Sequence, residues 1–233
     1  MRSSRVFCLF ITVTMLLPLE LPAMSGELSQ ALSWDQIFGW LRRPKPPYGS
    51  RGDNLCALSP ADVENETLML SVRPMFLWRG DAYAIALRTP NSETHLWEQV
   101  LPGQTDGIKL KQETLHRWQY SGQPLQSGKT YEFLLYRRVD DPAPKRSTFR
   151  ILANAEQAEV REMLANLQAK SERKNLMKEE IAVQRVQALM ERSLWSDAVV
   201  EAYAIKQPSV ELLQVMQQIP DKICKQAKDK AIR

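Results

Sequence analysis

Two histidines are the first residues to consider for chemistry, because imidazole is both a general base and the commonest metal ligand. His95 and His116 stand 21 residues apart, and neither has a cysteine or carboxylate at the spacing that metal sites use. Glu93 lies two residues before His95, which makes only a weak pair. The sequence therefore predicts no metal site and no cofactor.

Carboxylates are the second candidates, since two facing carboxyl groups can hydrolyse a glycosidic bond. The spacing of the acidic residues in the central part of the chain selects no two of them. Motifs for a serine nucleophile, a phosphate-binding loop, a dinucleotide site or a zinc protease are absent. We therefore expect no enzymatic activity, and a hydrolase with an unidentified carboxylate pair is an alternative. The acidic residues concerned are Glu98, Asp106, Glu113, Glu132 and Asp140.

Aromatic side chains could bind a sugar ring or a peptide if they stood together on the surface. Trp97, Trp118 and Tyr120 are the candidate binding aromatics, and Trp78 and Tyr83 belong to the same set. Rings of this size also supply much of the apolar area of a protein core. We expect most of them to pack in the core, with a glycan-binding surface as the alternative.

The first 25 residues have the layout of a secretory signal peptide. Arg2 and Arg5 precede an apolar run over residues 6–17, and the small residues Ala23 and Ser25 follow it. The run is shorter than the roughly 20 residues that a membrane-spanning helix needs. We expect cleavage after Ser25 and export to the periplasm, cell envelope or medium, without stable membrane insertion. An uncleaved N-terminal anchor is the alternative.

Export would place the remaining cysteines in an oxidising compartment. Cys8 leaves with the signal peptide, so Cys56 and Cys224 remain as an even number. They are the candidate disulfide, which would join the start of the strand-rich part to the end of the helical part. Two free, buried thiols are the alternative, because cysteine is often a small core residue.

The composition fits a globular protein of modest charge. Of the 233 residues, 44% are hydrophobic, and the formal net charge is +4. Loss of the signal peptide removes two arginines and one glutamate, which leaves +3. Because nucleic-acid binding usually needs a concentrated basic surface, we expect no nucleic-acid partner.

Residues 67–152 alternate between apolar and polar positions in the way of half-buried strands. Turn signals such as Pro102-Gly103 and Asp106-Gly107 separate the alternating runs. Short strands at this spacing predict an antiparallel β-sandwich. The clearest runs are 68–72, 75–78, 83–88, 95–100, 108–110, 131–136 and 149–151.

Leu125, Gly128 and Tyr131 stand at the entry to one of these strands. They resemble the tyrosine corner of fibronectin type III and immunoglobulin-like domains. In that motif a nearby turn backbone forms a hydrogen bond with a buried tyrosine hydroxyl. The resemblance implies a sandwich of that class and says nothing about a ligand.

After Asn154 the apolar residues repeat at helical spacing, as in Val160, Met163 and Leu167. Similar stripes predict helices around residues 181–190, 195–202 and 212–219. Pro208 and Pro220 are expected to break the later helices, because proline removes a helical N–H and clashes with the preceding turn.

The stretch "ALMERSLWSDAVVEAYAIKQPS" (188–209) resembles one tetratricopeptide repeat. Ser193 stands where the repeat has glycine, and the likeness rests on Ala188, Leu194-Trp195, Ala198, Ala202-Tyr203 and Pro208. One such unit cannot bury its own apolar face. We therefore expect a helical hairpin that packs on its neighbours, and not a peptide-binding array.

Together these patterns predict an α+β protein. We expect a signal peptide over 1–25, a linker or short helix over 26–47, and an immunoglobulin- or fibronectin-III-like sandwich over 48–153. A small α-helical tail with a single tetratricopeptide-like hairpin would follow over 154–233.

Five stretches occur in an order that is similar to a family of exported cyanobacterial proteins built on a domain of unknown function. The likeness implies that Gly49-Ser50-Arg51-Gly52 is the entry to the domain, so the Arg51-Gly52-Asp53 adhesion tripeptide would be incidental. It implies no catalytic residue or cofactor, because none is established for the family. The stretches are "YGSRGDNLCAL" (48–58), "LMLSVRPMFLWRG" (68–80), "LPGQTDGIKLK" (101–111), "LQSGKTYEFLLY" (125–136) and "LWSDAVVEAY" (194–203).

The function that we expect is binding or scaffolding in the periplasm or cell envelope, by a non-enzymatic exported protein. Its partner would be an envelope protein or a glycan. A peptidoglycan-binding module that uses exposed tryptophan and tyrosine is the first alternative. The sequence leaves the oligomeric state open.

Overall fold

The computed structural model describes residues 39, 55–61, 66–103, 107–110 and 113–231, and the side chains of these residues up to 224. The predicted signal peptide, the linker over 26–47 apart from Gly39, and the Arg51-Gly52-Asp53 tripeptide lie outside the described residues. All the described residues belong to one compact unit, which spans residues 31–233.

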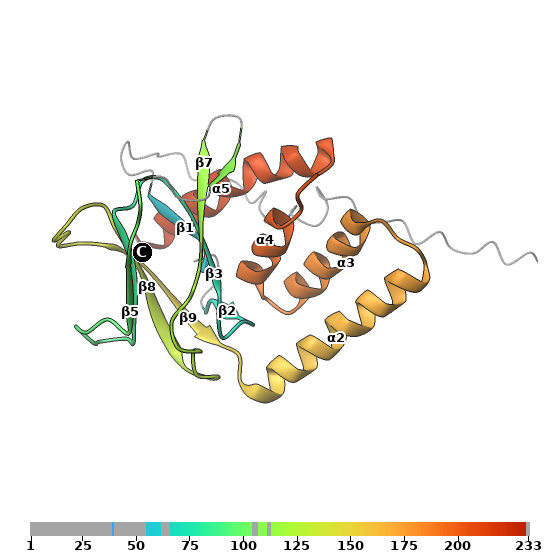
Figure 1. The fold of residues 1–233 in the computed structure, drawn as a ribbon, viewed down its shortest axis with the longest axis horizontal. Coiled ribbons are helices and arrows are strands. Elements are labelled where there is room, and N and C mark those ends of the chain that lie inside the picture. The colour runs from blue at the N-terminus through green and yellow to red at the C-terminus, as the bar shows by residue number, and fades with distance from the viewer. Residues whose placement is uncertain (1–38, 40–54, 62–65, 104–106, 111–112, 232–233) are drawn as a thin grey trace, which may run out of the picture. The chain divides into compact units, whose positions relative to one another are not determined.

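In the described part of the chain, nine strands precede four helices. The strands form two sheets (Figure 1). The strands are β1 (Cys56–Ser59), β2 (Leu68–Met69), β3 (Met75–Arg79), β4 (Ala84–Arg88), β5 (Trp97–Val100), β6 (Gly107–Lys109), β7 (Thr114–Gln119), β8 (Thr130–Tyr136) and β9 (Lys145–Ile151).

Sheet A has the strand order β1-β3-β7-β6, and sheet B has the order β2-β9-β8-β4-β5. Every pairing is antiparallel except that of β2 with β9, which is parallel. The α+β class and the mostly antiparallel sheets that the sequence predicts are confirmed. Strands β1 and β7 were not among the predicted strands.

An aromatic core lies between strands of the two sheets. Phe76 of β3 stacks on Phe133 of β8 with ring centroids 4.2 Å apart, and Phe149 of β9 meets Phe76 edge-on. All three rings are buried, as is Trp78. Stacked and edge-to-face pairs add to the gain from apolar burial, so this cluster holds sheet A against sheet B.

The helices are α2 (Asn154–Arg173), α3 (Lys178–Glu191), α4 (Trp195–Tyr203) and α5 (Val210–Ala231). At the start of α2, the Glu156 carboxylate accepts the N–H of Ala153 at 2.7 Å. At the start of α3, Glu180 accepts the N–H of Met177 at the same distance. Both bonds satisfy an amide that would otherwise lack a partner at the helix start.

The turn between α3 and α4 contains Ser193 in the left-handed backbone region, with φ of 57°. This is the position where the sequence has serine in place of the glycine of a tetratricopeptide repeat. The backbone there needs the conformation that glycine adopts most easily. Serine therefore stands in a strained position.

The prediction that Pro220 breaks a helix is wrong, because α5 continues through it to Ala231. Proline cannot bond the carbonyl oxygen of the residue four positions earlier, which is Met216. The buried Tyr203 hydroxyl donates to that oxygen at 2.6 Å. A side chain of α4 thus replaces the missing backbone donor of α5.

Strands and helices share a second core. Leu58 of β1, Leu77 of β3 and Leu115 of β7 belong to the same buried cluster as residues of all four helices. Strand β9 ends at Ile151, and α2 begins three residues later. The helical part therefore packs directly on sheet A.

Candidate functional site

The outer face of sheet B is the surface of the strands that points away from the aromatic core. Ala84 of β4 has Val100 of β5 on one side and Tyr136 of β8 on the other. In the next row Ala86 lies between Glu98 and Leu134. Side chains alternate along a strand, so these residues share one face while Ile85 and Phe133 point into the core.

A chain of three polar groups crosses this face. His95 Nδ1 lies 2.8 Å from a Glu98 carboxylate oxygen, and its Nε2 lies 2.9 Å from the Tyr136 hydroxyl. The imidazole therefore ties the β5 side of the sheet to β8 across β4. Ala84 and Ala86 of β4 are almost fully buried, as expected of small side chains beneath such a bridge.

The structure pairs His95 with Glu98 and not with Glu93, the neighbour that the sequence suggested. Burial raises the pKa of the Tyr136 hydroxyl, and the Arg88 guanidinium opposes this rise. A phenol with a raised pKa is a poor nucleophile at neutral pH. The hydrogen-bonded chain of Glu98, His95 and Tyr136 is thus better suited to fixing these side chains in place than to covalent catalysis.

A buried carboxylate lies further along the same face. Glu132 of β8 is 7% exposed, and its oxygens accept from Arg88 Nε at 2.7 Å and from Arg146 Nη1 at 3.5 Å. Two guanidinium groups therefore compensate one buried charge, which would otherwise be costly. The Arg146 side chain remains 57% exposed and leaves cationic surface beside the network.

The loop that joins β8 to β9, residues 137–144, follows directly after Tyr136. The Asp141 carboxylate accepts the N–H groups of Arg137 and Ala143, both at 3.1 Å. These bonds lower the pKa of Asp141. The loop is thus fixed by its own side chain, and it presents Arg138 and the 57% exposed Val139 to solvent.

The three candidate binding aromatics lie against the aromatic core. Tyr120 is 3% exposed, and its ring meets Trp97 edge-on at 5.2 Å. Trp97 and Trp118 are partly buried and pack on the same cluster. The other histidine, His116, stacks on the buried Trp78 at 5.5 Å. Burial lowers the pKa of His116, which Asp81 opposes.

The carboxylates of the hydrolase alternative are spread over different places. Glu98 contacts His95, Glu132 contacts Arg88, and Glu113 contacts Arg79 of sheet A. Asp140 lies in the loop after β8, and Asp106 lies outside the described residues. Glu98, Glu113 and Glu132 are thus each paired with a cation or an imidazole, and not with one another.

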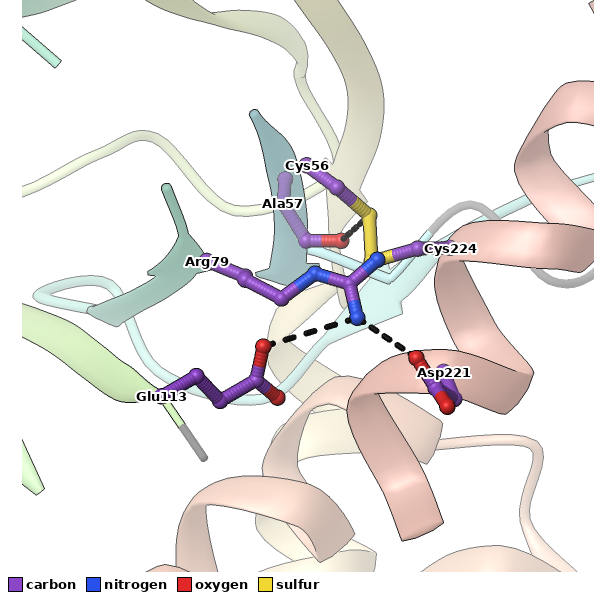
Figure 2. Close-up of a disulfide and its surroundings, with 6 residues drawn as sticks. All are labelled: Cys56, Ala57, Arg79, Glu113, Asp221 and Cys224. Atoms are coloured by element: carbon purple, nitrogen blue, oxygen red, sulfur yellow. Dashed lines mark hydrogen bonds and ion pairs between the residues drawn. A yellow bond between two sulfur atoms is a disulfide. The ribbon is translucent and has the colours of Figure 1, made fainter. Parts of the chain in front are cut away.

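Cys56 and Cys224 form a disulfide with a Cα–Cα distance of 5.8 Å, which joins β1 to α5 (Figure 2). Arg79 lies directly opposite Cys56 in the β1–β3 register. Figure 2 shows the Arg79 guanidinium directed at Asp221 and Glu113, at 2.8 and 3.6 Å. A disulfide of this kind contributes about 2–5 kcal/mol, whereas an ion pair with an exposed partner contributes about 1 kcal/mol or less.

The first turn of α4 makes a second junction with the strands. The Ser196 hydroxyl oxygen accepts the N–H of Ala61, and the Asp197 carboxylate accepts the N–H of Leu70, both at 2.9 Å. Burial raises the pKa of Asp197 to about 7, although the Leu70 bond lowers it. Two adjacent side chains therefore bind backbone amides that follow β1 and β2.

In the parts of the chain that the structure describes, no cluster of three histidine, cysteine or acidic residues could hold a metal ion. Within the same parts, every helix is too short or too polar to span a bilayer.

Comparison of the chain with protein-family models, with curated proteins and with solved structures gives no match.

Proposed function

We propose that this chain is an exported, non-enzymatic binding or scaffolding protein of the periplasm or cell envelope. Its contact surface would be the β8–β9 loop, 137–144, together with the exposed side chains of the outer face of sheet B, which are Glu98, Val100 and Arg146. The observation that carries the proposal is the fixed conformation of this loop, in which Asp141 holds two backbone amides. A loop that is already ordered loses little entropy when it binds a partner.

The strand order supports an immunoglobulin-like assignment for the two sheets. An immunoglobulin fold has its first, second, fifth and fourth strands in one sheet. Sheet A has this order if β2 is an extension of the first strand that crosses to the other sheet, and if β5 is an extra strand of that sheet as in variable-type domains. The N–H of Gln126 donates to the Tyr131 hydroxyl at 2.9 Å, as in a tyrosine corner. In such sandwiches the end loops are common recognition sites.

The α3–α4 hairpin supports the likeness to a single tetratricopeptide repeat. Ala188, Ala198 and Ala202 are buried between the helices and their neighbours. Ser193 has the left-handed backbone that the glycine of the repeat would adopt. We infer that the hairpin is a packing unit, since it is covered by sheet A and α5 within the shared core.

The proposal can be tested by capture of partners from the native envelope. The exported form would be tagged and compared with a variant that carries Arg138→Glu and Val139→Ser in the β8–β9 loop. Lys109→Glu, which is exposed on β6 of sheet A, is the matched control. We expect one protein partner that the loop variant loses and the control keeps. A partner that both variants keep equally would contradict this contact surface.

Peptidoglycan serves as a second bait for the glycan-binding alternative. Retention on purified peptidoglycan that is lost in Trp97→Ala and Trp118→Ala would favour that alternative over the proposal. Because both rings pack on the core, the near-ultraviolet circular dichroism of each variant must first match that of the unmodified protein.

A further inference from the structure

Helix α5 has two halves that meet at Pro220. In the first half, Leu212, Val215 and Ile219 are buried in the shared core. At the junction, Pro220 has no N–H, and the Met216 carbonyl oxygen is bonded by the Tyr203 hydroxyl. The backbone hydrogen bonds of the helix are thus interrupted immediately before Asp221.

The second half of α5 shares this core through Ile223 and Cys224, and it has two further links to the strands. Cys224 is bonded to Cys56 of β1, and Asp221 is paired with Arg79 of β3. The two α5 residues are three positions apart and share a face of the helix. Cys56 and Arg79 are cross-strand partners on the sheet. Two neighbouring links thus join the second half of α5 to sheet A, and only the disulfide is covalent. Ile223 adds buried apolar area.

Cys56 is the more exposed of the two half-cystines, so a thiol reductant would attack there. Cys224 is 2% exposed, whereas Cys56 lies partly exposed on β1 at the edge of sheet A. A thiolate of an external dithiol would attack the Cys56 sulfur and release the Cys224 thiolate. The second thiol of the reductant then displaces Cys56. The protein disulfide gains two electrons and two protons, and the reductant becomes a disulfide.

Arg79 provides a partner for the reduced state. Its Nε–H is buried, and it has no acceptor among the described residues. Because Arg79 faces Cys56 across β1 and β3, a free Cys56 sulfur would be an acceptor close to this donor. Reduction would therefore satisfy a group that the oxidised protein leaves unpaired.

We propose that the Cys56–Cys224 disulfide is a redox latch on the second half of α5. In the oxidised protein this half is fixed to β1. Reduction by a dithiol releases residues 221–231 from the sheet, with Pro220 as the hinge, while the first half of α5 and both sheets stay folded. The device responds to the redox state of the compartment that the protein occupies.

Hydrogen exchange of the purified, exported protein tests the latch, with dithiothreitol as the probe. We expect the backbone amides of residues 221–231 to exchange at least tenfold faster after reduction, while amides of β8 and of residues 210–219 change less than twofold. Unchanged exchange in 221–231 would overturn the proposal. A rise spread evenly over the strands would also overturn it, since it would show that the disulfide supports the whole fold.

Two variants separate a latch from a purely structural disulfide. Cys224→Ser should reproduce the reduced pattern without reductant, and Asp221→Asn, which keeps the disulfide, should change exchange less than threefold. Pro220→Ala restores the missing N–H, so exchange of residues 221–231 in the reduced protein should become several-fold slower. If Cys224→Ser fails to fold, hydrogen exchange of the reduced unmodified protein and of reduced Pro220→Ala still tests the proposal. Equal exchange in these two reduced proteins would contradict the hinge.

Discussion

The Tyr203 hydroxyl donates a 2.6 Å hydrogen bond to the carbonyl oxygen of Met216, the oxygen that Pro220 leaves without a helical donor. Both groups are buried in the core that the helices share with sheet A. A buried carbonyl without a donor is unfavourable. A proline in the middle of a helix is thus tolerated because a neighbouring helix supplies the missing bond.

Tyr203→Phe removes this donor and leaves the rest of the ring in place. We expect the free energy of unfolding in denaturant to fall by about 1–3 kcal/mol, because the carbonyl loses its partner. In a Pro220→Ala background the new amide can bond the carbonyl, so the cost of Tyr203→Phe should be smaller. Equal costs in the two backgrounds would show that the two residues do not interact.

Asp197→Asn tests the junction between α4 and the strands. The pKa of Asp197 is raised to about 7 in the folded protein, from an ordinary value of 3.8. The folded state therefore holds the proton more tightly, and this residue's contribution to stability falls as the pH rises from about 4 to about 7. Asparagine does not titrate, so the variant should lose this pH dependence.

The measurement is the difference in unfolding free energy between Asp197→Asn and the unmodified protein at pH 4 and pH 8. We expect the difference to shift by about 2–4 kcal/mol in favour of the variant at the higher pH. Glu201, which also acts on Asp197, stays paired with Arg185 in both proteins. Asp140→Asn in the β8–β9 loop is the control, and parallel profiles for Asp197→Asn would refute the assignment.

Tyr131→Phe tests the bond at the entry to β8. The Gln126 N–H would lose the hydroxyl oxygen that accepts it at 2.9 Å. We expect a loss of about 1–2 kcal/mol in unfolding free energy, measured with urea, since the ring stays buried and only the hydrogen bond is removed. A change below about 0.5 kcal/mol would mean that water replaces the hydroxyl at no cost.

Ala86→Leu tests whether the polar bridge on sheet B leaves space above β4. Ala86 is fully buried between Glu98 and Leu134. A larger side chain must displace the His95 bridge or its neighbours, so we expect a loss of about 1–3 kcal/mol. Thr148→Leu, at an exposed position of β9, should change stability by less than about 0.5 kcal/mol. Thermal unfolding of both variants measures the contrast.

The sequence predicts the strands that are rich in apolar and aromatic residues, such as β4 and β8, and these two strands are buried along most of their length. It does not predict β7, because Thr114–Gln119 mixes a leucine, a histidine and a tryptophan with polar residues and shows no clear alternation. Strand β1 is only four residues long and follows a turn-rich stretch. Its pairing with β3 comes from distant contacts that no local pattern records.

The candidate site also depends on contacts between residues that are distant in sequence. The spacing of His95 and Glu98 does not reveal that Tyr136, 41 residues away, completes their hydrogen-bonded chain. The sequence identifies Trp97 as a candidate binding aromatic. It does not show that the ring lies on the inner face of sheet B, because that depends on the register of β5 with β4. The local effect of proline predicts a helix break at Pro220, whereas the compensating Tyr203 hydroxyl lies on another helix.

The bond between Cys56 and Cys224 also closes the chain into a covalent ring, because it joins two cysteines at a sequence separation of 168. All strands after β1 and all helices up to Cys224 lie inside this ring. A protease that cuts the β8–β9 loop once would therefore leave a single molecule of unchanged mass, except for one added water. Two cuts within the ring, or one cut followed by reduction, would be needed before any piece of the ring could leave.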